Sequence, residues 1–239
     1  MATTIATRRR INNRQPQSIL ELDRQVQQLQ QYLYNFWLRK IKKLAFTESL
    51  PIEFFRKKYE DELEVNLRKF IEQIYITRIK SLEKKLIRIE QKRKRELTRS
   101  KSASISDVFT SILDIENIKK TVTAVKDRFF NSASRLISRA STSRFNPFSN
   151  KVEIPAKFDE QAAFKRVGSF GAYSAYNDAT QSKLGQIDDT QKVIYITARD
   201  ERVCNICNPF DGEVYEVLSA DAPYLPQHEF CRCFYEPVI

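Results

Sequence analysis

Glycine is scarce in this chain, with four residues in 239. Loops that need positive backbone φ angles must therefore be few, which excludes collagen-like and glycine-linker proteins and argues against a glycine-rich nucleotide loop. No stretch approaches the ~20 apolar residues that a membrane-spanning helix needs. Arg8, Arg9 and Arg10 precede any hydrophobic run, and no apolar core follows them, so we do not expect a secretory signal peptide. A basic, acid-free organellar transit peptide is the alternative for this segment.

Cysteine and histidine are absent from the first 203 residues. The four cysteines and the one histidine all lie between positions 204 and 233. This clustering indicates a single metal site in the C-terminal part of the chain. Disulfide scaffolds are typical of short secreted chains, and no secretory signal is expected here. We therefore interpret the chain as an intracellular or virion protein.

The net charge of +11 is unevenly distributed, since residues 1–150 carry +16 and residues 151–239 carry −5. Two basic runs are candidates for binding double-stranded DNA without sequence preference, through the release of counterions from phosphates. They comprise Arg8, Arg9 and Arg10 in the first run and Lys92, Arg93, Lys94 and Arg95 in the second. The alternative for the second run is a solvated helix end whose cations complement the helix dipole.

Apolar residues recur every three or four positions through residues 18–130, which is typical of amphipathic helices. One pattern covers residues 19–44 and a longer one covers residues 52–99, so we expect an antiparallel helical hairpin. Asp107 is a candidate cap for a third helix, which would complete a hairpin or bundle. The polar, basic residues 1–17 are predicted to be a flexible arm, and residues 131–158, rich in Ser, Asn and Arg, a linker.

Residues 159–239 are predicted to form a helix followed by a small β-rich module. The helix is expected over Asp159–Lys183, with Gly185 near its end. β-branched and aromatic residues predict strands at 192–197, 213–218 and 233–238, and Asp211–Gly212 is typical of a hairpin turn. The expected fold is therefore mainly α, with a long helical hairpin or bundle followed by a small zinc-stapled β module, an α+β protein.

The C-terminal module carries five candidate metal ligands in two groups. Cys204 and Cys207 are separated by two residues, and His228, Cys231 and Cys233 follow a gap of twenty residues. Thiolates and an imidazole at this spacing predict a tetrahedral, structural Zn²⁺ site that uses four of the five. The spacing favours Cys204, Cys207, His228 and Cys231. Cys231 and Cys233 share one face of a strand, however, so Cys233 is an alternative ligand.

Disulfides and a redox-active Cys-x-x-Cys pair are the alternatives to a metal, although no thioredoxin-like βαβ pattern surrounds Cys204–Cys207. We do not expect catalysis by the zinc ion, because catalytic zinc keeps an open position and needs a general base. The order of the motifs differs from that of nucleobase deaminases. The one histidine cannot serve both a metal and a catalytic triad, so we expect no enzyme activity.

The residues that flank the ligands form an ordered string: Thr197, Arg199, Asp200, Arg202, Val203, Cys204, Cys207, Asp211, Gly212, His228, Cys231, Arg232 and Cys233. This string resembles the C-terminal signature of the phage head-morphogenesis, or minor head protein, family (phage Mu F-like). Glu229 stands where that family usually has proline. The similarity does not extend to the helical residues that precede the string.

The resemblance implies a minor structural virion protein of a tailed phage that acts in procapsid assembly with portal, capsid and scaffold proteins. It further implies several copies per virion, in the head interior or portal region, and a cytoplasmic stage in the host during assembly. The apolar hairpin would dock on portal or capsid protein, the basic segments would face packaged DNA, and no membrane partner is expected. The alternative is a zinc-containing DNA-binding regulatory protein, against which the −5 charge of residues 151–239 argues.

Overall fold

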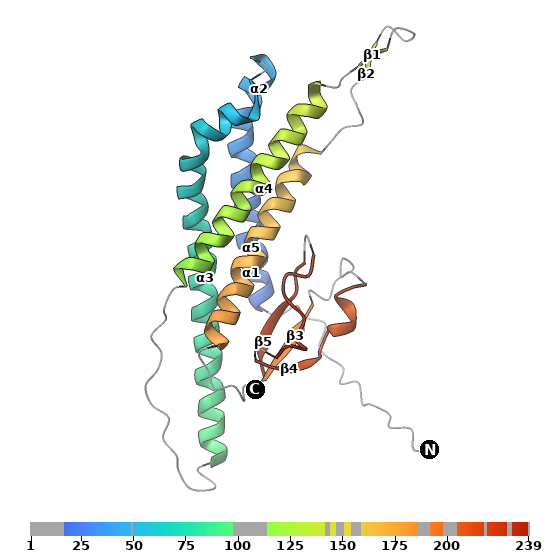
Figure 1. Ribbon diagram of the computed structural model, residues 1–239. Helices are drawn as coiled ribbons and strands as arrows, with labels where there is room; N and C mark the ends of the chain where they lie inside the picture. The colour runs from blue at the N-terminus through green and yellow to red at the C-terminus, as the bar shows by residue number, and fades with distance from the viewer. Residues whose placement is uncertain are drawn as a thin grey trace, which may run out of the picture.

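A computed structural model describes residues 17–48, 50–97, 114–141, 144–146, 151–153, 159–185, 192–197, 205–217, 219–228 and 231–238. Over these residues the protein is mainly helical, and a small three-stranded antiparallel sheet forms from its C-terminal part (Figure 1). The expected fold class, a helical body followed by a small β module, is confirmed. No helix in these ranges combines the length and the apolar character needed to cross a membrane.

The body consists of long helices that run roughly alongside one another (Figure 1): α1 (Gln17–Phe36), α3 (Ile52–Leu97), α4 (Ile115–Ser141) and α5 (Glu160–Leu184). Shorter elements lie between them in the chain: the π-helical turn η1 (Trp37–Lys42), α2 (Lys43–Thr47), β1 (Arg144–Asn146) and β2 (Lys151–Glu153). The C-terminal module comprises β3 (Lys192–Ile196), the 3₁₀ turn η2 (Asn208–Phe210), β4 (Val214–Glu216) and β5 (Phe234–Pro237).

The apolar stripe of α1 is buried in the bundle core, as its periodicity predicts: Leu22, Val26, Leu29, Leu33 and Phe36. α1 and α3 run antiparallel (Figure 1), but α1 packs mainly against α5 rather than α3. The absence of a side chain at Gly168 of α5 allows this approach, because a Cβ there would lie 2.9 Å from the Cα of Gln30. The predicted two-helix hairpin is therefore part of a bundle in which α5 covers α1.

A π-helical turn interrupts the helix expected over residues 19–44. Trp37 and Ile41, at the start and near the end of this turn, are both fully buried. The indole Nε1 of Trp37 donates to Glu160 Oε2 at 3.3 Å, and the Lys42 ammonium donates to the same oxygen at 2.9 Å. A π turn changes the direction in which the following side chains point. In this protein the turn coincides with the hydrogen bonds that hold Trp37 and Lys42 to Glu160 at the start of α5.

The predicted linker over residues 131–158 is wrong in its first part, because α4 continues to Ser141. The apolar stripe that includes Phe129 and Phe130 extends through the buried side chains of Ala133 and Leu136. The Ser, Asn and Arg residues that suggested a loop occupy the remaining faces of this amphipathic helix. α4 is capped by Asp114, whose Oδ1 accepts from the Asn117 N–H at 3.0 Å, and the predicted cap at Asp107 lies outside the described residues.

The last helix and the three strands agree with the sequence prediction. Asp159 caps α5 by accepting from the N–H of Ala162 at 3.1 Å, and Gly185 follows its end. The strand order is β4–β3–β5, and Ile194 of the central strand pairs with Val214 on one side and Glu236 on the other. The expected turn at Asp211–Gly212 is also confirmed, since Gly212 has a φ of 88° that a residue with a side chain rarely adopts.

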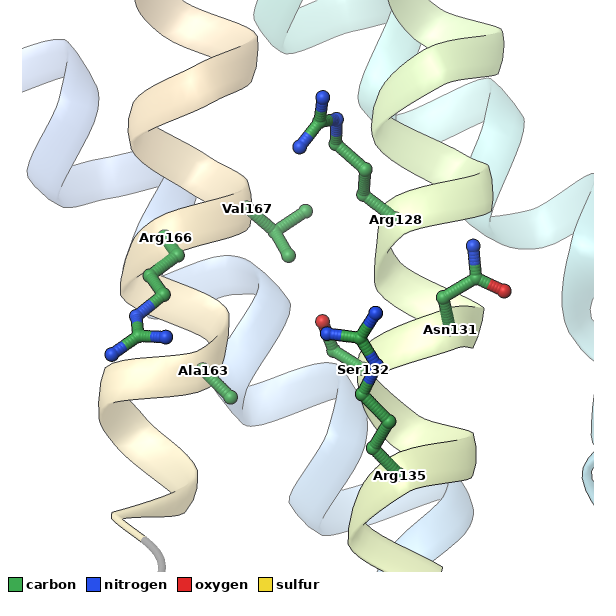
Figure 2. Close-up of a pocket in the computed structure, with 7 residues that line it drawn as sticks. All are labelled: Arg128, Asn131, Ser132, Arg135, Ala163, Arg166 and Val167. Atoms are coloured by element: carbon green, nitrogen blue, oxygen red, sulfur yellow. The ribbon is translucent and has the colours of Figure 1, made fainter. Parts of the chain in front are cut away.

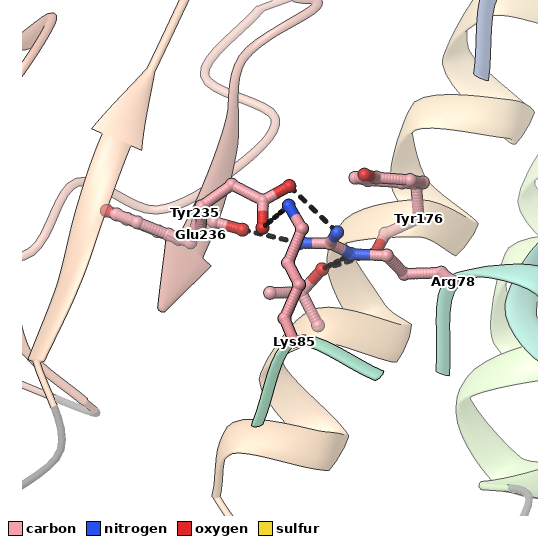
Figure 3. A network of polar contacts seen from close by, with 6 residues as sticks. Arg78, Lys85, Tyr176, Tyr235 and Glu236 are labelled. Carbon is pink, nitrogen blue, oxygen red and sulfur yellow. Dashed lines mark hydrogen bonds and ion pairs between the residues drawn. The ribbon is translucent and has the colours of Figure 1, made fainter. Parts of the chain in front are cut away.

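A buried arginine joins this sheet to the bundle (Figure 3). Arg78 of α3 is 1% exposed, and its guanidinium donates to Glu236 Oε1 at 2.9 Å, to the carbonyl oxygen of Tyr235 at 2.6 Å and to Thr180 Oγ1 at 2.8 Å. It thus contacts β5 and α5 at once. The guanidinium carbon also lies 4.2 Å from the centre of the Tyr176 ring, a cation–π contact.

Glu236 receives a second cation from the same helix. The ammonium of Lys85 lies 2.6 Å from Glu236 Oε2. Burial of Glu236 opposes its ionisation, but the charges of Arg78 and Lys85 outweigh this effect and hold the pKa of Glu236 below its ordinary value. The ion network therefore fixes the edge strand of the module against α3.

Candidate metal centre

Two short turns bring candidate ligands together in the C-terminal module. On one side, the N–H of Phe210 donates to the carbonyl oxygen of Cys207 at 3.2 Å, which forms the turn that leads into η2. On the other side, the N–H of Cys231 donates to the carbonyl oxygen of His228 at 3.1 Å. The side chains of Cys207, His228 and Cys231 converge, and one potential ligand atom from each lies within 4.8 Å of the others.

The potential ligand atoms of these three residues lie close to one another. The Sγ atom of Cys207 lies 3.2 Å from His228 Nε2 and 3.8 Å from the Sγ atom of Cys231. Both cysteines are 1% exposed, whereas His228 is partly exposed. Among the described residues, no disulfide joins Cys207, Cys231 and Cys233.

The loop that carries Cys207 is held against β3 by residues of the flanking string. The N–H and the hydroxyl of Thr197 donate to Asp211 Oδ1 at 2.9 and 3.0 Å. The N–H of Gly212 donates to the carbonyl oxygen of Tyr195 at 2.9 Å. Thr197 and Asp211–Gly212, which are members of the string, therefore attach the Cys207 turn to the central strand.

Tyr195 of β3 lies beside the thiols and was not predicted as a site residue. Its side chain is fully buried, with its ring 5.7 Å from that of Phe210 and 5.5 Å from that of Tyr235. Burial raises the pKa of Tyr195, and the nearby thiols of Cys233 and Cys207 add to this effect, so the hydroxyl stays protonated. The alternation of β3, which places Val193 and Tyr195 on the buried face, is the sequence signal that could have identified it.

The thiols influence one another through hydrogen bonding. The Cys233 thiol donates toward Cys231, which lowers the pKa of Cys231 to about 5 even though burial alone would raise it. The same interaction and burial raise the pKa of Cys233. A thiolate at Cys231 is therefore favoured at neutral pH, and the thiolate is the form that binds metal ions.

The separation of the two sulfur atoms fits a tetrahedral ion. Bonds of ~2.3 Å to sulfur at tetrahedral angles place two sulfur ligands about 3.8 Å apart. The distance between the sulfurs of Cys207 and Cys231 is 3.8 Å. Two thiols and an imidazole therefore supply three ligands that could hold a metal ion.

The structure brings together three of the five predicted ligands. Cys204 lies outside the described residues. Cys233 is 4% exposed and close to Cys231, but it is not a member of the converging group. Of the alternatives left open by the sequence, this arrangement favours Cys231 over Cys233 as the ligand next to His228.

The predicted DNA-binding residues fall at the edges of the described structure. Arg8, Arg9 and Arg10 lie outside the described residues. α3 runs through positions 92–95 and ends at Leu97, so Lys92, Arg93, Lys94 and Arg95 lie near its C-terminal end, but their side chains are outside the described set. Their position in the chain is compatible with both interpretations of this run.

Comparisons with protein-family models, with curated proteins and with solved structures give no match for this chain.

Proposed function

We propose that the Cys207–His228–Cys231 group binds Zn²⁺, with Cys204 as the fourth ligand. Thiolate and imidazole ligands together favour zinc among the divalent ions that proteins commonly bind. The 3.8 Å separation of the two sulfurs and the low pKa of Cys231 support this assignment. The ligands come from two turns that are far apart in the chain, so an ion would cross-link them.

The role proposed for the ion is structural. Cys207 and Cys231 are each 1% exposed, and they belong to the same small apolar cluster as Val193, Tyr195 and Leu225. A module with so small a core gains much of its folding free energy from a bound metal. The described members of the group are two thiols and an imidazole, with no carboxylate placed as a general base, so a non-enzymatic role is proposed.

Elemental analysis of the purified, reduced protein tests the metal assignment. We expect about one zinc per chain, as for a single tetrahedral site. Cys207→Ser should abolish stoichiometric zinc, and Cys204→Ser should weaken it, whereas the matched variant Cys233→Ser should retain it. If Cys233→Ser loses zinc and Cys204→Ser keeps it, Cys233 rather than Cys204 is the fourth ligand. A wild-type protein that is natively folded without metal would refute the site.

For the whole chain, we propose a minor structural virion protein of a tailed phage, present in several copies, that acts in head morphogenesis through contacts with portal, capsid or scaffold proteins. The observation that carries this proposal is the position of the ligand group within the string that resembles the minor head protein signature. Two further residues of that string, Thr197 and Asp211, are joined by hydrogen bonds that hold the Cys207 loop against β3. The long helices provide extended surface for docking on partner proteins.

Purification of phage particles and procapsids from a lysate, followed by mass spectrometry, tests this assignment. We expect peptides of this chain in procapsids at a few copies per portal, and defective heads when its gene is deleted. A protein that is absent from particles but binds one duplex sequence preferentially would instead support the zinc-containing DNA-binding regulator. Turnover of DNA or RNA by the zinc-loaded protein would refute both.

A further inference from the structure

A cavity of about 340 Å³ opens between α4 and the N-terminal half of α5. The C-terminal module lies beside the other half of α5 (Figure 1), so the cavity is separate from the candidate metal centre. Its polar lining comprises Arg128, Asn131, Ser132 and Arg135 of α4 and Arg166 of α5. Every side chain of this lining that carries a formal charge is an arginine.

The arginines of the lining come from both helices (Figure 2). Arg128 and Arg135 extend from α4 into the space that faces α5, and Arg135 passes over Ser132, whereas Arg166 runs along α5 with its guanidinium on the side away from α4 in this view. Arg128 is oriented by Phe170, since its guanidinium carbon lies 3.9 Å from the centre of that ring. A guanidinium stacked on a ring keeps its N–H donors directed sideways, away from the ring.

The acidic side chains closest along the chain have other partners. Asp127 pairs with Arg56, Asp159 caps α5, and Glu160 accepts from Trp37 and Lys42. Within the described part of the chain, no carboxylate pairs with Arg135, which is exposed. The lining of the cavity is therefore positively charged, with three arginines and no carboxylate.

The sequence extends this charge beyond the cavity. From residue 128 to residue 152 the chain contains no Asp or Glu, but it contains Arg128, Arg135, Arg139, Arg144 and Lys151. This acid-free stretch includes the second half of α4 and most of the hairpin formed by β1 and β2. Arginine forks match the oxygens of a phosphate in a bidentate manner, and an extended run of cations suits a polyanion rather than an isolated anion.

We propose that this cavity holds a backbone phosphate of double-stranded DNA, bound by Arg128 and Arg135 with Arg166 on the α5 side of the lining. Ser132, which points into the space between the helices, offers a neutral hydrogen-bond donor for a remaining phosphate oxygen. The contact does not read sequence, because it involves the phosphate and not the base edges. This site is distinct from the two basic runs predicted from the sequence, and it stands whether or not the chain is a virion component.

Fluorescence anisotropy with the full, metal-loaded chain and a short labelled duplex of random sequence tests the proposal. The variant Arg135→Gln/Arg166→Gln should lower the affinity for the duplex about tenfold or more, since each charge-assisted hydrogen bond that is removed carries a factor of this order. The slope of log affinity against log salt should become shallower by about 1 for each phosphate that is no longer neutralised. The matched control, Arg24→Gln/Arg88→Gln, removes two exposed arginines from α1 and α3 and should have a much smaller effect.

Two further measurements keep the test decisive. Both double variants should show the same circular dichroism spectrum and melting temperature as the wild type, because all four arginines are exposed. The variant Arg135→Lys/Arg166→Lys keeps the charge and should regain part of the affinity but not all of it, because lysine lacks the bidentate fork.

Equal losses of affinity in the two Gln variants would refute the site, because the effect would then reflect net charge alone. Two competitors of the duplex, inorganic phosphate and polyglutamate, test other ligands for the cavity. If inorganic phosphate at low concentration binds and stabilises the wild type, while the variants do not differ in DNA binding, the ligand of the cavity would be a free phosphate compound. Preferential binding of polyglutamate over the duplex would assign it to an acidic protein segment. Either outcome would overturn the DNA proposal.

Discussion

Replacement of Arg78 by methionine should detach the C-terminal module from the bundle. Arg78 is 1% exposed and donates to Glu236, to the Tyr235 carbonyl oxygen and to Thr180. Methionine has a similar length and fills the space, but it removes the charge and all three hydrogen bonds. The carboxylate of Glu236, with its side chain 6% exposed, would keep only Lys85 as a partner.

The size of the effect follows from the buried charge. Loss of one partner from a buried ion pair typically costs about 3–5 kcal/mol, because the remaining charge is left without compensation. Lys85, whose side chain is 31% exposed, compensates part of this cost by staying 2.6 Å from Glu236 Oε2. We therefore expect Arg78→Met to lower the free energy of unfolding by about 3 kcal/mol, a large part of the ~5–15 kcal/mol typical of a domain.

A double-mutant cycle separates the ion pair from the packing. Urea denaturation followed by circular dichroism should show that Arg78→Met/Glu236→Gln is less destabilised than the sum of the two single variants by about 1–3 kcal/mol. The control Arg88→Met changes an exposed arginine on the same helix and should stay within about 0.5 kcal/mol of the wild type. A loss below about 1 kcal/mol for Arg78→Met, or strictly additive effects in the cycle, would contradict the role assigned to this network.

Three further perturbations test other parts of the structure. Cys207→Ser, or a strong chelator added to the wild type, should make residues 192–238 sensitive to protease while the helices stay resistant; equal resistance in a time course of limited proteolysis would exclude a metal brace. Burial, with a smaller contribution from Asp114, raises the pKa of Asp178 from 3.8 to about 6, although the hydrogen bond from Thr121 opposes the rise. A folded-state pKa above the unfolded value means that the stabilisation by this group is complete below pH ~4 and is lost as the pH rises through about 6. Asp178→Asn should therefore be more stable than the wild type by about 2–3 kcal/mol above neutrality, with the difference vanishing near pH 4 in urea titrations; a difference independent of pH would contradict the assignment. Gly168→Ala should destabilise the bundle by about 1–3 kcal/mol despite the better helix propensity of alanine, because its Cβ would meet the backbone of Gln30; an unchanged or higher melting temperature would show that α1 and α5 can separate without cost.

The elements of this protein were largely predictable because their signals are local. Apolar spacing located α1 and α3, and β-branched and aromatic runs located the three strands of the module. The helix predicted over Asp159–Lys183 coincides with α5. The predicted linker was too long because composition was given more weight than the apolar stripe, which continues through Ala133 and Leu136. The π-helical turn at Trp37–Lys42 was missed because its cause, the contact of Trp37 and Lys42 with Glu160, is remote in sequence.

The candidate site was predictable in its residue types but not in its setting. The spacing of cysteines and histidine identified the ligands of which Cys207, His228 and Cys231 converge. The neighbours of this group depend on strand pairing, so Tyr195 was overlooked. The Arg78–Glu236 pair spans 158 positions and the arginine cavity joins two helices, and no local pattern reports such contacts. Long-range pairing was therefore the part of the structure that the sequence did not provide.

The central place of α5 has a consequence for how the chain folds. This helix packs against α1, α3, α4 and β5, yet it is made after the first three of them. The hydrogen bond from Gln30 to Ser169 closes a loop of 139 residues, and contacts of such separation are slow to form. Until α5 leaves the ribosome, the apolar faces of the earlier helices lack their packing partner and stay exposed. We therefore expect the nascent chain to bind chaperones during synthesis.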